Sequence, residues 1–236
     1  MATSLVCVVS ASKLLGPVRR RLSRMESGRD GGWIEAPPGV DDSPEGIAAL
    51  KRHVRDEVRS RRAGMSDRKR RAAAVALTER LISLVRDRGA ESVSCYASLL
   101  GEPDTSAFLT WAHRTGVEVL LPISLPGSRL AWRRFDGEQM VPGRHGIPEP
   151  GGELVPVSAF ASVDLMLVPA CAVDLRGTRL GWGLGYFDRM LSAADRLPPV
   201  FAVVHDHEVL PALPREPHDV PVDGVVTPSA IRTFSR

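Results

Sequence analysis

The sequence predicts an α/β fold: a single three-layer domain with a twisted, mainly parallel sheet and two N-terminal helices. Apolar residues recur at helical spacing from about residue 44 to residue 88, and short apolar runs alternate with helical patterns after that. Such a β-α-β alternation is typical of parallel sheets. The length of 236 residues, of which 43% are hydrophobic, suits one domain with an appendage.

Residues 1–44 are expected to be an extension outside the domain. They lack sustained periodicity, and the stretch ESGRDGGWIEAPPGVDDSPEG is rich in Gly, Pro and acidic residues. We therefore expect residues 1–44 to be disordered, or to result from an over-called start, and residues 45–236 to form the α/β domain. A targeting segment is the alternative, because the opening is poor in acidic residues and contains Ser and Arg.

Two helices follow, and both are expected to pack on the sheet. Ser43 and Pro44 suit the N-cap and first turn of a helix that Gly64 ends. The apolar stripe of this helix consists of Ile47, Leu50, Val54 and Val58. Ser66 caps the second helix, whose buried face carries Ala73, Leu77, Leu81 and Leu84. The basic run that opens the second helix, residues 67–71, is interpreted as a solvated face.

The remaining elements form the sheet and its crossover helices. The predicted strands are Ser92–Ser98, Val117–Pro122, Leu130–Phe135, Asp164–Cys171, Val200–Asp206 and Asp223–Pro228. Helices are predicted over Thr105–Gly116 and from Tyr186 onward, and residues 141–156 are predicted to be loop.

Polar groups follow three of the predicted strands. They are Glu102, the loop Arg179–Arg189 and the run HDHE at residues 205–208. In open parallel sheets, ligands bind beyond the carboxyl ends of the strands. The sequence therefore predicts one cleft in which these distant segments meet.

Composition excludes several classes of protein. The three cysteines are scattered without paired spacing, which argues against a disulfide framework and favours a reducing, cytoplasmic compartment. No run approaches the roughly 18 to 20 apolar residues that a membrane span requires, so we expect no membrane partner. The net charge is +3, with a larger basic surplus in the two N-terminal helices that suits an anionic small molecule or nucleic acid.

The loop RLGWGLGYFDR, Arg179 to Arg189, is the strongest candidate for chemistry. Glycines at alternate positions allow positive φ angles and bring backbone N–H groups close to an anion. The spacing matches neither the Walker loop nor the dinucleotide fingerprint, so a structural turn is an equal alternative for the glycines alone. Asp188 suits either a favourable first-turn charge or a Mg²⁺ ligand, and Asp219 or Asp223 offers a second carboxylate.

Three separated blocks resemble the 5-formyltetrahydrofolate cyclo-ligase (5,10-methenyltetrahydrofolate synthetase) family. They are KRHVR at residues 51–55, RLGWGLGYFDR at residues 179–189 and LPREPHDVPVDGVVTP at residues 213–228. The resemblance implies a single α/β domain that uses ATP and Mg²⁺ to phosphorylate the N5-formyl oxygen of 5-formyltetrahydrofolate. N10 then attacks the activated carbon, phosphate leaves, and 5,10-methenyltetrahydrofolate forms beside ADP.

The resemblance also implies roles for individual residues. ATP contacts fall on Lys51, Arg52, His53, Val54, Arg55, Arg179, Leu180, Gly181, Trp182, Gly183, Leu184, Gly185, Tyr186 and Phe187. Substrate contacts fall on Arg55, Glu102, Trp182, Gly183, Leu184, Gly185 and Tyr186. Arg55, Arg179 and Tyr186 are implied as catalytic residues, and Asp188 and Asp219 as Mg²⁺ ligands. The sequence departs from the usual pattern at Leu184, where Lys or Gly is common, at Phe187, which is often Tyr, and at Glu208, where Gln is common.

Three alternatives stay open at this point. One is a folate- or nucleotide-binding paralogue with little or no cyclo-ligase activity. Another is a nucleic-acid binder that uses the basic helices, but it leaves Asp188, Asp219 and the glycines unexplained. A zinc site built on His205, His207 and His218 is the third. We favour the enzyme, with a folate as its small-molecule partner, no nucleic acid, and a monomeric state.

Overall fold

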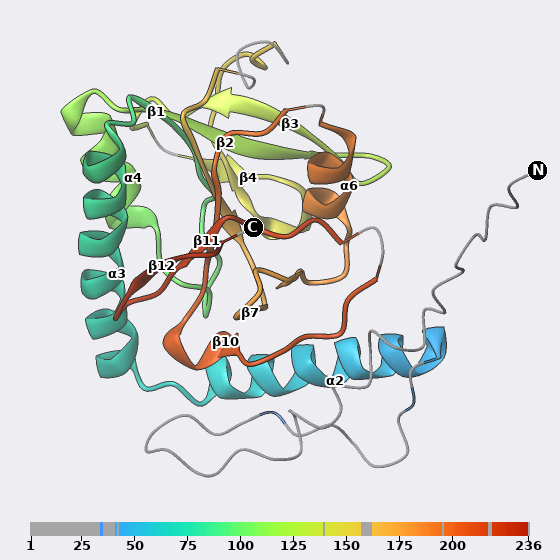
Figure 1. Cartoon of the computed structure of the whole chain (residues 1–236). Helices are drawn as coiled ribbons and strands as arrows, with labels where there is room; N and C mark the ends of the chain where they lie inside the picture. Colours follow the sequence, from blue (N-terminus) through green and yellow to red (C-terminus); the bar gives the residue numbers. More distant parts are fainter. Residues whose placement is uncertain are drawn as a thin grey trace, which may run out of the picture.

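A seven-stranded, mainly parallel sheet forms the centre of the molecule (Figure 1). The computed structural model describes residues 34, 41, 43–138, 140–156, 162–194, 196–216 and 219–235. The strands of the sheet, in spatial order, are β12 (Ile231–Thr233), β11 (Gly224–Val226), β9 (Val200–Val203), β6 (Leu165–Pro169), β1 (Ser92–Ser94), β2 (Glu118–Leu125) and β3 (Arg129–Arg134). The five inner strands pair in parallel, and the edge strands β12 and β3 pair antiparallel with their neighbours. The predicted α/β class is confirmed.

Helices cover both faces of this sheet. The helices are α2 (Pro44–Ala63), α3 (Asp67–Arg88), α4 (Ser106–Thr115) and α6 (Tyr186–Ala193). Leu77 and Leu81 of α3 and Phe108 of α4 are buried in one cluster with residues of β1, β6 and β9. Leu191 of α6 is buried in a second cluster with Trp132 and other strand residues. Figure 1 shows α3 and α4 on one side of the sheet and α6 on the other.

The helix ends follow local chemistry that the sequence predicts. The Ser43 hydroxyl accepts a hydrogen bond from the Gly46 N–H at 3.0 Å, with Pro44 in the first turn of α2. The Ser66 hydroxyl accepts one from the Lys69 N–H at the start of α3. Gly116 ends α4 in the left-handed conformation, where glycine has no steric cost.

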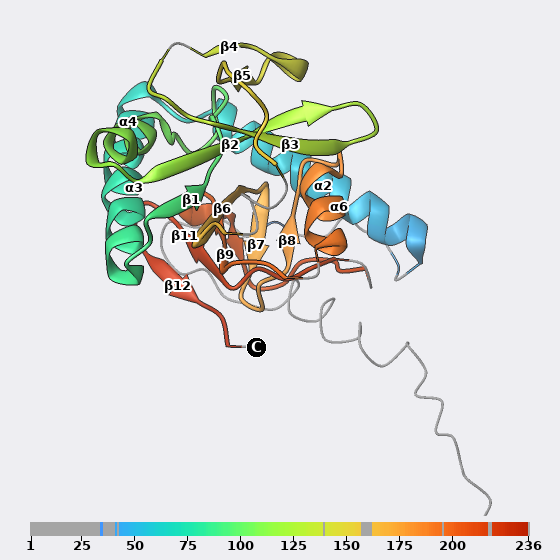
Figure 2. The same cartoon turned by 90° about the horizontal axis from the view of Figure 1, so that it is seen from above.

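The prediction that α2 packs on the central sheet is wrong. A small three-stranded sheet lies between them, formed by β10 (Val209–Leu210), β7 (Ala172–Asp174) and β8 (Arg179–Leu180). Val54 and Val58 of α2 are buried against Ala172, Leu180 and Leu210 of this sheet. Both views place α2 beside the small sheet (Figures 1 and 2). Apolar residues on the other side of the same small sheet, such as Val173, join the cluster of the central sheet.

Other differences concern the lengths of elements. The strands β1, β6, β9 and β11 are shorter than predicted, and β2 is longer. The segment predicted as loop contains a two-stranded ribbon, β4 (Val141–Pro142) and β5 (Pro148–Glu149), around a short 3₁₀ turn, Arg144–Gly146. The edge strand β12 was not predicted. A second 3₁₀ turn, Asp206–Glu208, follows β9. Within the described residues, no helix is long and apolar enough to cross a membrane.

One described residue of the predicted extension packs on the domain. Ile34 is 4% exposed and joins Val54 and Val58 in the cluster between α2 and the small sheet. Most of residues 1–44 lie outside the described residues. The alternatives of a disordered extension, a targeting segment and an over-called start concern those residues and stay predictions.

We expect Ile34→Ala to lower the free energy of unfolding by about 2 kcal/mol, because it leaves a cavity between α2 and the small sheet. Urea denaturation followed by circular dichroism measures this change. Val75→Ala is the matched control, since Val75 is 63% exposed on α3. An unfolding curve for Ile34→Ala that overlays that of the parent chain would contradict the packing of Ile34.

Candidate functional site

A cavity of about 670 Å³ lies where the strand order of the central sheet reverses. Strand β1 lies between β2 on one side and β6 on the other. The chain runs from β1 to β2 on one side and from β6 to β9 on the other, so the segments that follow β1 and β6 diverge. We call this space the switch-point cavity. Its walls include Glu102, which follows β1, Pro169 at the end of β6, and the loop residues Trp182 and Tyr186. The predicted cleft is therefore present for Glu102 and the glycine loop, but residues 205–208, which were expected to meet them there, do not line it.

A second cavity of about 680 Å³ lies on the other side of the glycine loop. We call it the carboxylate cavity, because Asp188, Glu216 and Asp219 line it together with Lys51 and Arg55. Gly185 and Asp188 line both cavities. The loop predicted to carry chemistry is thus the shared wall between two spaces.

Two of the three glycines of this loop adopt backbone conformations that other residues rarely reach. Gly183 has a φ of +92° and Gly185 a φ of +72°, and Gly185 precedes the first turn of α6. The loop is tied to α2 by a hydrogen bond of 2.8 Å from Arg55 Nε to the Gly181 carbonyl. Alternate left-handed glycines before a helix N-terminus provide backbone N–H groups for an anion.

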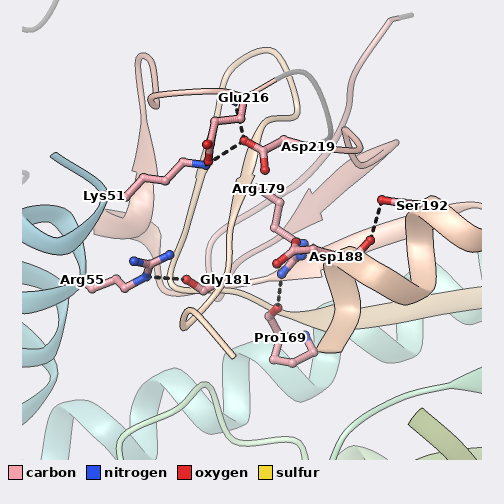
Figure 3. Close-up of polar contacts among 9 residues, drawn as sticks. All are labelled: Lys51, Arg55, Pro169, Arg179, Gly181, Asp188, Ser192, Glu216 and Asp219. Atoms are coloured by element: carbon pink, nitrogen blue, oxygen red, sulfur yellow. Dashed lines mark hydrogen bonds and ion pairs between the residues drawn. The ribbon is translucent and has the colours of Figure 1, made fainter. Parts of the chain in front are cut away.

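Arg179 and Asp188 form an ion pair beneath the loop (Figure 3). The Arg179 side chain is 2% exposed, and its second terminal nitrogen donates to the Pro169 carbonyl at 3.4 Å. Burial lowers the pKa of Arg179, and the charge of Asp188 opposes that shift. Asp188 remains 34% exposed and lines both cavities.

Lys51 joins the two acidic residues that follow the small sheet. Its Nζ atom lies 2.6 Å from Glu216 Oε2 and 3.0 Å from Asp219 Oδ2 (Figure 3). Asp219 Oδ2 also accepts a hydrogen bond of 2.8 Å from the Glu216 N–H. The donor set suits Mg²⁺, which takes one or two carboxylates beside phosphate oxygens, and Asp188 and Asp219 line the same cavity.

Arg62, which the sequence analysis did not select, holds the most buried ion pair of the site. Its Nε and a terminal nitrogen donate to the two carboxylate oxygens of Glu208 at 2.7 and 2.9 Å. The same terminal nitrogen donates to the Ala170 carbonyl at 3.1 Å. Burial opposes the charge of Arg62, but the hydrogen bonds and charge of Glu208 outweigh it, so the pKa of Arg62 is raised.

His145 is a second residue that sequence reasoning missed. It lies in the 3₁₀ turn between β4 and β5 with a φ of +60° and lines the switch-point cavity. Its Nε2 atom is 3.2 Å from the Tyr186 hydroxyl. The sequence gives no signal for His145, because its turn lies inside a Gly- and Pro-rich stretch that is typical of a loop.

The zinc alternative finds no support in the described residues. The rings of His205 and His207 stack at 5.8 Å, and burial lowers the pKa of both. Among the residues that the structure describes, no three His, Cys, Asp or Glu side chains form a group that could hold a metal. His218 lies outside the described residues.

The other predicted contact residues divide into three groups. Gly181, Leu184 and Phe187 line the switch-point cavity, and Gly183 lines the carboxylate cavity. Val54 and Leu180 are buried in the cluster beneath α2. Arg52 is exposed and His53 half-buried, and neither lines one of the two cavities. Contacts from Arg52, His53, Val54 and Leu180 to a ligand stay predictions.

Glu102 lies half-buried in the wall of the switch-point cavity. Burial raises its pKa, opposed by a hydrogen bond of 2.9 Å from the Leu99 N–H and by the charge of Arg62. A carboxyl whose pKa is raised in the folded state destabilises that state once it ionises.

We therefore expect Glu102→Gln to raise the melting temperature at pH 8, and this gain to disappear as the pH falls below the ordinary pKa of a glutamate. Gln keeps an acceptor for the Leu99 N–H, so the charge is the main change. Melting curves of both proteins from pH 4 to pH 8 test this, with Glu79→Gln on the exposed side of α3 as control. A pH-independent difference would refute the raised pKa.

Comparisons with known proteins point to a single family. The family model of the 5-formyltetrahydrofolate cyclo-ligase family matches residues 47–228. A 5-formyltetrahydrofolate cyclo-ligase of Mycolicibacterium smegmatis is 37% identical over 142 residues, which cover 58% of this chain and 73% of the relative. The enzyme of the same name from Escherichia coli is 33% identical over 147 residues, or 60% of this chain and 80% of the relative.

Solved structures show the same fold. The NMR structure of Aquifex aeolicus 5,10-methenyltetrahydrofolate synthetase has a TM-score of 0.68 and 31% identity, covering 79% of this chain and 94% of that one. A 5,10-methenyltetrahydrofolate synthetase from Mycoplasma pneumoniae is 16% identical with a TM-score of 0.61, covering 75% and 98% of the two chains, so it supports the fold alone.

Proposed function

Because this chain belongs to the 5-formyltetrahydrofolate cyclo-ligase family, we propose that it converts 5-formyltetrahydrofolate to 5,10-methenyltetrahydrofolate with Mg-ATP, releasing ADP and phosphate. The observation that carries the proposal is the position of the glycine loop. It separates the carboxylate cavity, which is rich in ionic groups, from the switch-point cavity, whose walls are mostly apolar. ATP phosphates belong in the carboxylate cavity and the folate in the switch-point cavity.

Phosphoryl transfer needs positioning and charge neutralisation more than it needs a protein nucleophile. The formyl oxygen attacks the γ-phosphorus, the bond to ADP breaks, and the electron pair leaves with ADP. N10 then attacks the formyl carbon, phosphate departs with the formyl oxygen, and N10 loses its proton to solvent. The parts on either side of the loop fit the first step, because cationic side chains and glycine N–H groups meet there.

Each residue has a role in this proposal. Arg179 and Arg55 neutralise charge on the transferred phosphoryl group from opposite sides of the loop, and the N–H groups of Gly183 and Gly185 bind its oxygens. Asp188 and Asp219 would hold Mg²⁺, which neutralises phosphate charge when bound. Lys51, paired with Glu216 and Asp219, exchanges a carboxylate for a phosphate oxygen as ATP enters.

Tyr186 and Glu102 belong to the folate side of the proposal. Both line the switch-point cavity, where Glu102 accepts hydrogen bonds from a pterin and Tyr186 orients the formyl group. Catalytic roles for Arg55, Arg179 and Tyr186 are part of the proposal, as are the ATP and folate contacts. The cytoplasmic location and monomeric state stay predictions from the sequence.

The deciding experiment mixes the purified chain with Mg-ATP and 5-formyltetrahydrofolate and follows the absorbance of the methenyl product. We expect product formation that depends on ATP and on Mg²⁺. Absence of product at high protein concentration, together with thermal stabilisation by either ligand, would identify a binding paralogue instead. In that case Leu184→Lys tests whether the 51% exposed Leu184 at the loop accounts for the loss.

A further inference from the structure

One face of α2 runs along the glycine loop and carries three arginines at helical spacing. Arg55, Arg59 and Arg62 are at positions i, i+4 and i+7 and therefore share this face. Arg55 holds the Gly181 carbonyl. The next residue of the loop, Trp182, has the guanidinium carbons of Arg62 and Arg59 at 4.9 and 5.5 Å from its ring centroid. The helix thus contacts two successive loop residues.

The two arginines at the Trp182 ring differ in how firmly they are held. Arg59 has a 62% exposed side chain and pairs with the exposed Asp56 of the same helix. Arg62 has a 6% exposed side chain and donates to both oxygens of Glu208 and to Ala170. Glu208 is fully buried and accepts a further hydrogen bond of 2.8 Å from the His205 N–H. Arg62 is therefore fixed by groups that follow β6 and β9, strands of the central sheet.

A buried ion pair of this kind adds little to stability on average, because desolvation offsets the attraction between its charges. What a bidentate pair does provide is a fixed position, since the planar fork of arginine matches the carboxylate. The surface that it fixes is the ring of Trp182, a wall of the switch-point cavity. Arg62 and Glu208 therefore fix Trp182 of the loop relative to the central sheet.

We propose that Glu208 and Arg62 are positioning residues that hold Trp182 as a rigid aromatic wall for the ring system of the substrate. This inference rests on the proposed function for the identity of the substrate. Trp182 is the best cation–π acceptor among the side chains, and a flat aromatic wall suits a flat heterocycle.

The test is the double variant Arg62→Met with Glu208→Gln, which removes both charges together and leaves no unpaired buried ion. Gln keeps an acceptor for the His205 N–H. We expect the KM for 5-formyltetrahydrofolate to rise about 5- to 10-fold, an effect that lies between those of an exposed and a desolvated cation–π contact. The KM for ATP and kcat should change less than about 2-fold, since the pair does not reach the carboxylate cavity.

A second readout does not depend on catalysis. Acrylamide quenching of Trp182 fluorescence, taken as the difference between each protein and its Trp182→Phe counterpart, measures how firmly the ring is held. We expect stronger quenching in the double variant than in the parent chain. Arg80→Met with Glu79→Gln is the matched control, because it removes one exposed cation and one exposed anion from α3.

The outcomes separate the two proposals. A parent chain without activity refutes the proposed function, and the quenching comparison still decides the positioning role. An active parent whose double variant keeps its folate KM and its quenching overturns the positioning role alone. A rise in both KM values with a drop of about 10 °C or more in the melting temperature overturns it too, because that pattern indicates general loss of structure.

Discussion

Asp188→Asn is expected to lower kcat/KM for Mg-ATP by about 100-fold, which corresponds to about 2.7 kcal/mol of lost transition-state stabilisation. The affinity for 5-formyltetrahydrofolate should change by less than about 3-fold. Asn keeps the size of the side chain but removes the charge that both pairs with Arg179 and suits Mg²⁺. Steady-state kinetics with varied Mg-ATP, and equilibrium binding of the folate, measure the two effects separately.

Asp67→Asn is the matched control for this variant. Like Asp188, Asp67 is the acidic residue in the first turn of its helix, but it is exposed and lines neither cavity. It therefore reports the loss of a favourable helix-dipole interaction together with one exposed ion pair to Arg70. Equal losses of ATP use and folate affinity in Asp188→Asn would show that Asp188 merely supports the fold, and a melting curve checks this directly.

Arg179→Lys should lower kcat by about 100-fold, a typical cost of removing one preorganised donor from a charge-stabilising site. Lys keeps the positive charge, but it lacks the planar fork that pairs with Asp188 while donating to Pro169. Because Arg179 and Asp188 act on each other, the double variant with Asp188→Asn should lose less than the product of the single losses. Single-turnover kinetics isolate the chemical step.

Arg134→Lys controls for the loss of an arginine–carboxylate pair as such. Arg134 pairs with Glu118 at 2.6 Å on the exposed face of β3 and lines neither cavity. We expect kcat to stay within about 2-fold of the parent value, because exposed pairs contribute little. A normal kcat in Arg179→Lys would contradict the catalytic role of Arg179.

Much of this fold follows from local patterns. The N-caps Ser43 and Ser66, the apolar stripes of α2 and α3, and the buried runs of β6 and β9 each have a signal within a few residues. The small sheet has no such local signal. Its strands β7 and β8 contain only three and two residues, too few to show an alternation of apolar and polar side chains. These strands form because Asp174 Oδ1 accepts hydrogen bonds from the Arg176 and Thr178 N–H groups and closes the turn between them. Without this sheet, the position of α2 could not be predicted.

The candidate site was predictable to a similar extent. The glycine block and Asp188 are contiguous, so their proximity is visible in the chain itself. Arg62 is one arginine among many in a basic helix, and its partner Glu208 lies 146 residues later. Its spacing of seven residues from Arg55 was the available signal. The position of His145 is set by the ribbon of β4 and β5. These strands contain only two residues each, so the sequence carries no strand pattern that predicts them.

The loop between the two cavities has a thermodynamic consequence. Gly185 and Asp188 belong to both walls, so under the proposed assignment of ATP and folate to the two cavities each ligand would contact residues that the other also contacts. The two binding equilibria are then linked, and any factor by which the nucleotide changes folate affinity must equal the factor by which the folate changes nucleotide affinity. Two titrations, each with and without a non-hydrolysable partner ligand, give that factor twice, and we expect it to differ from one because the two ligands would share a wall.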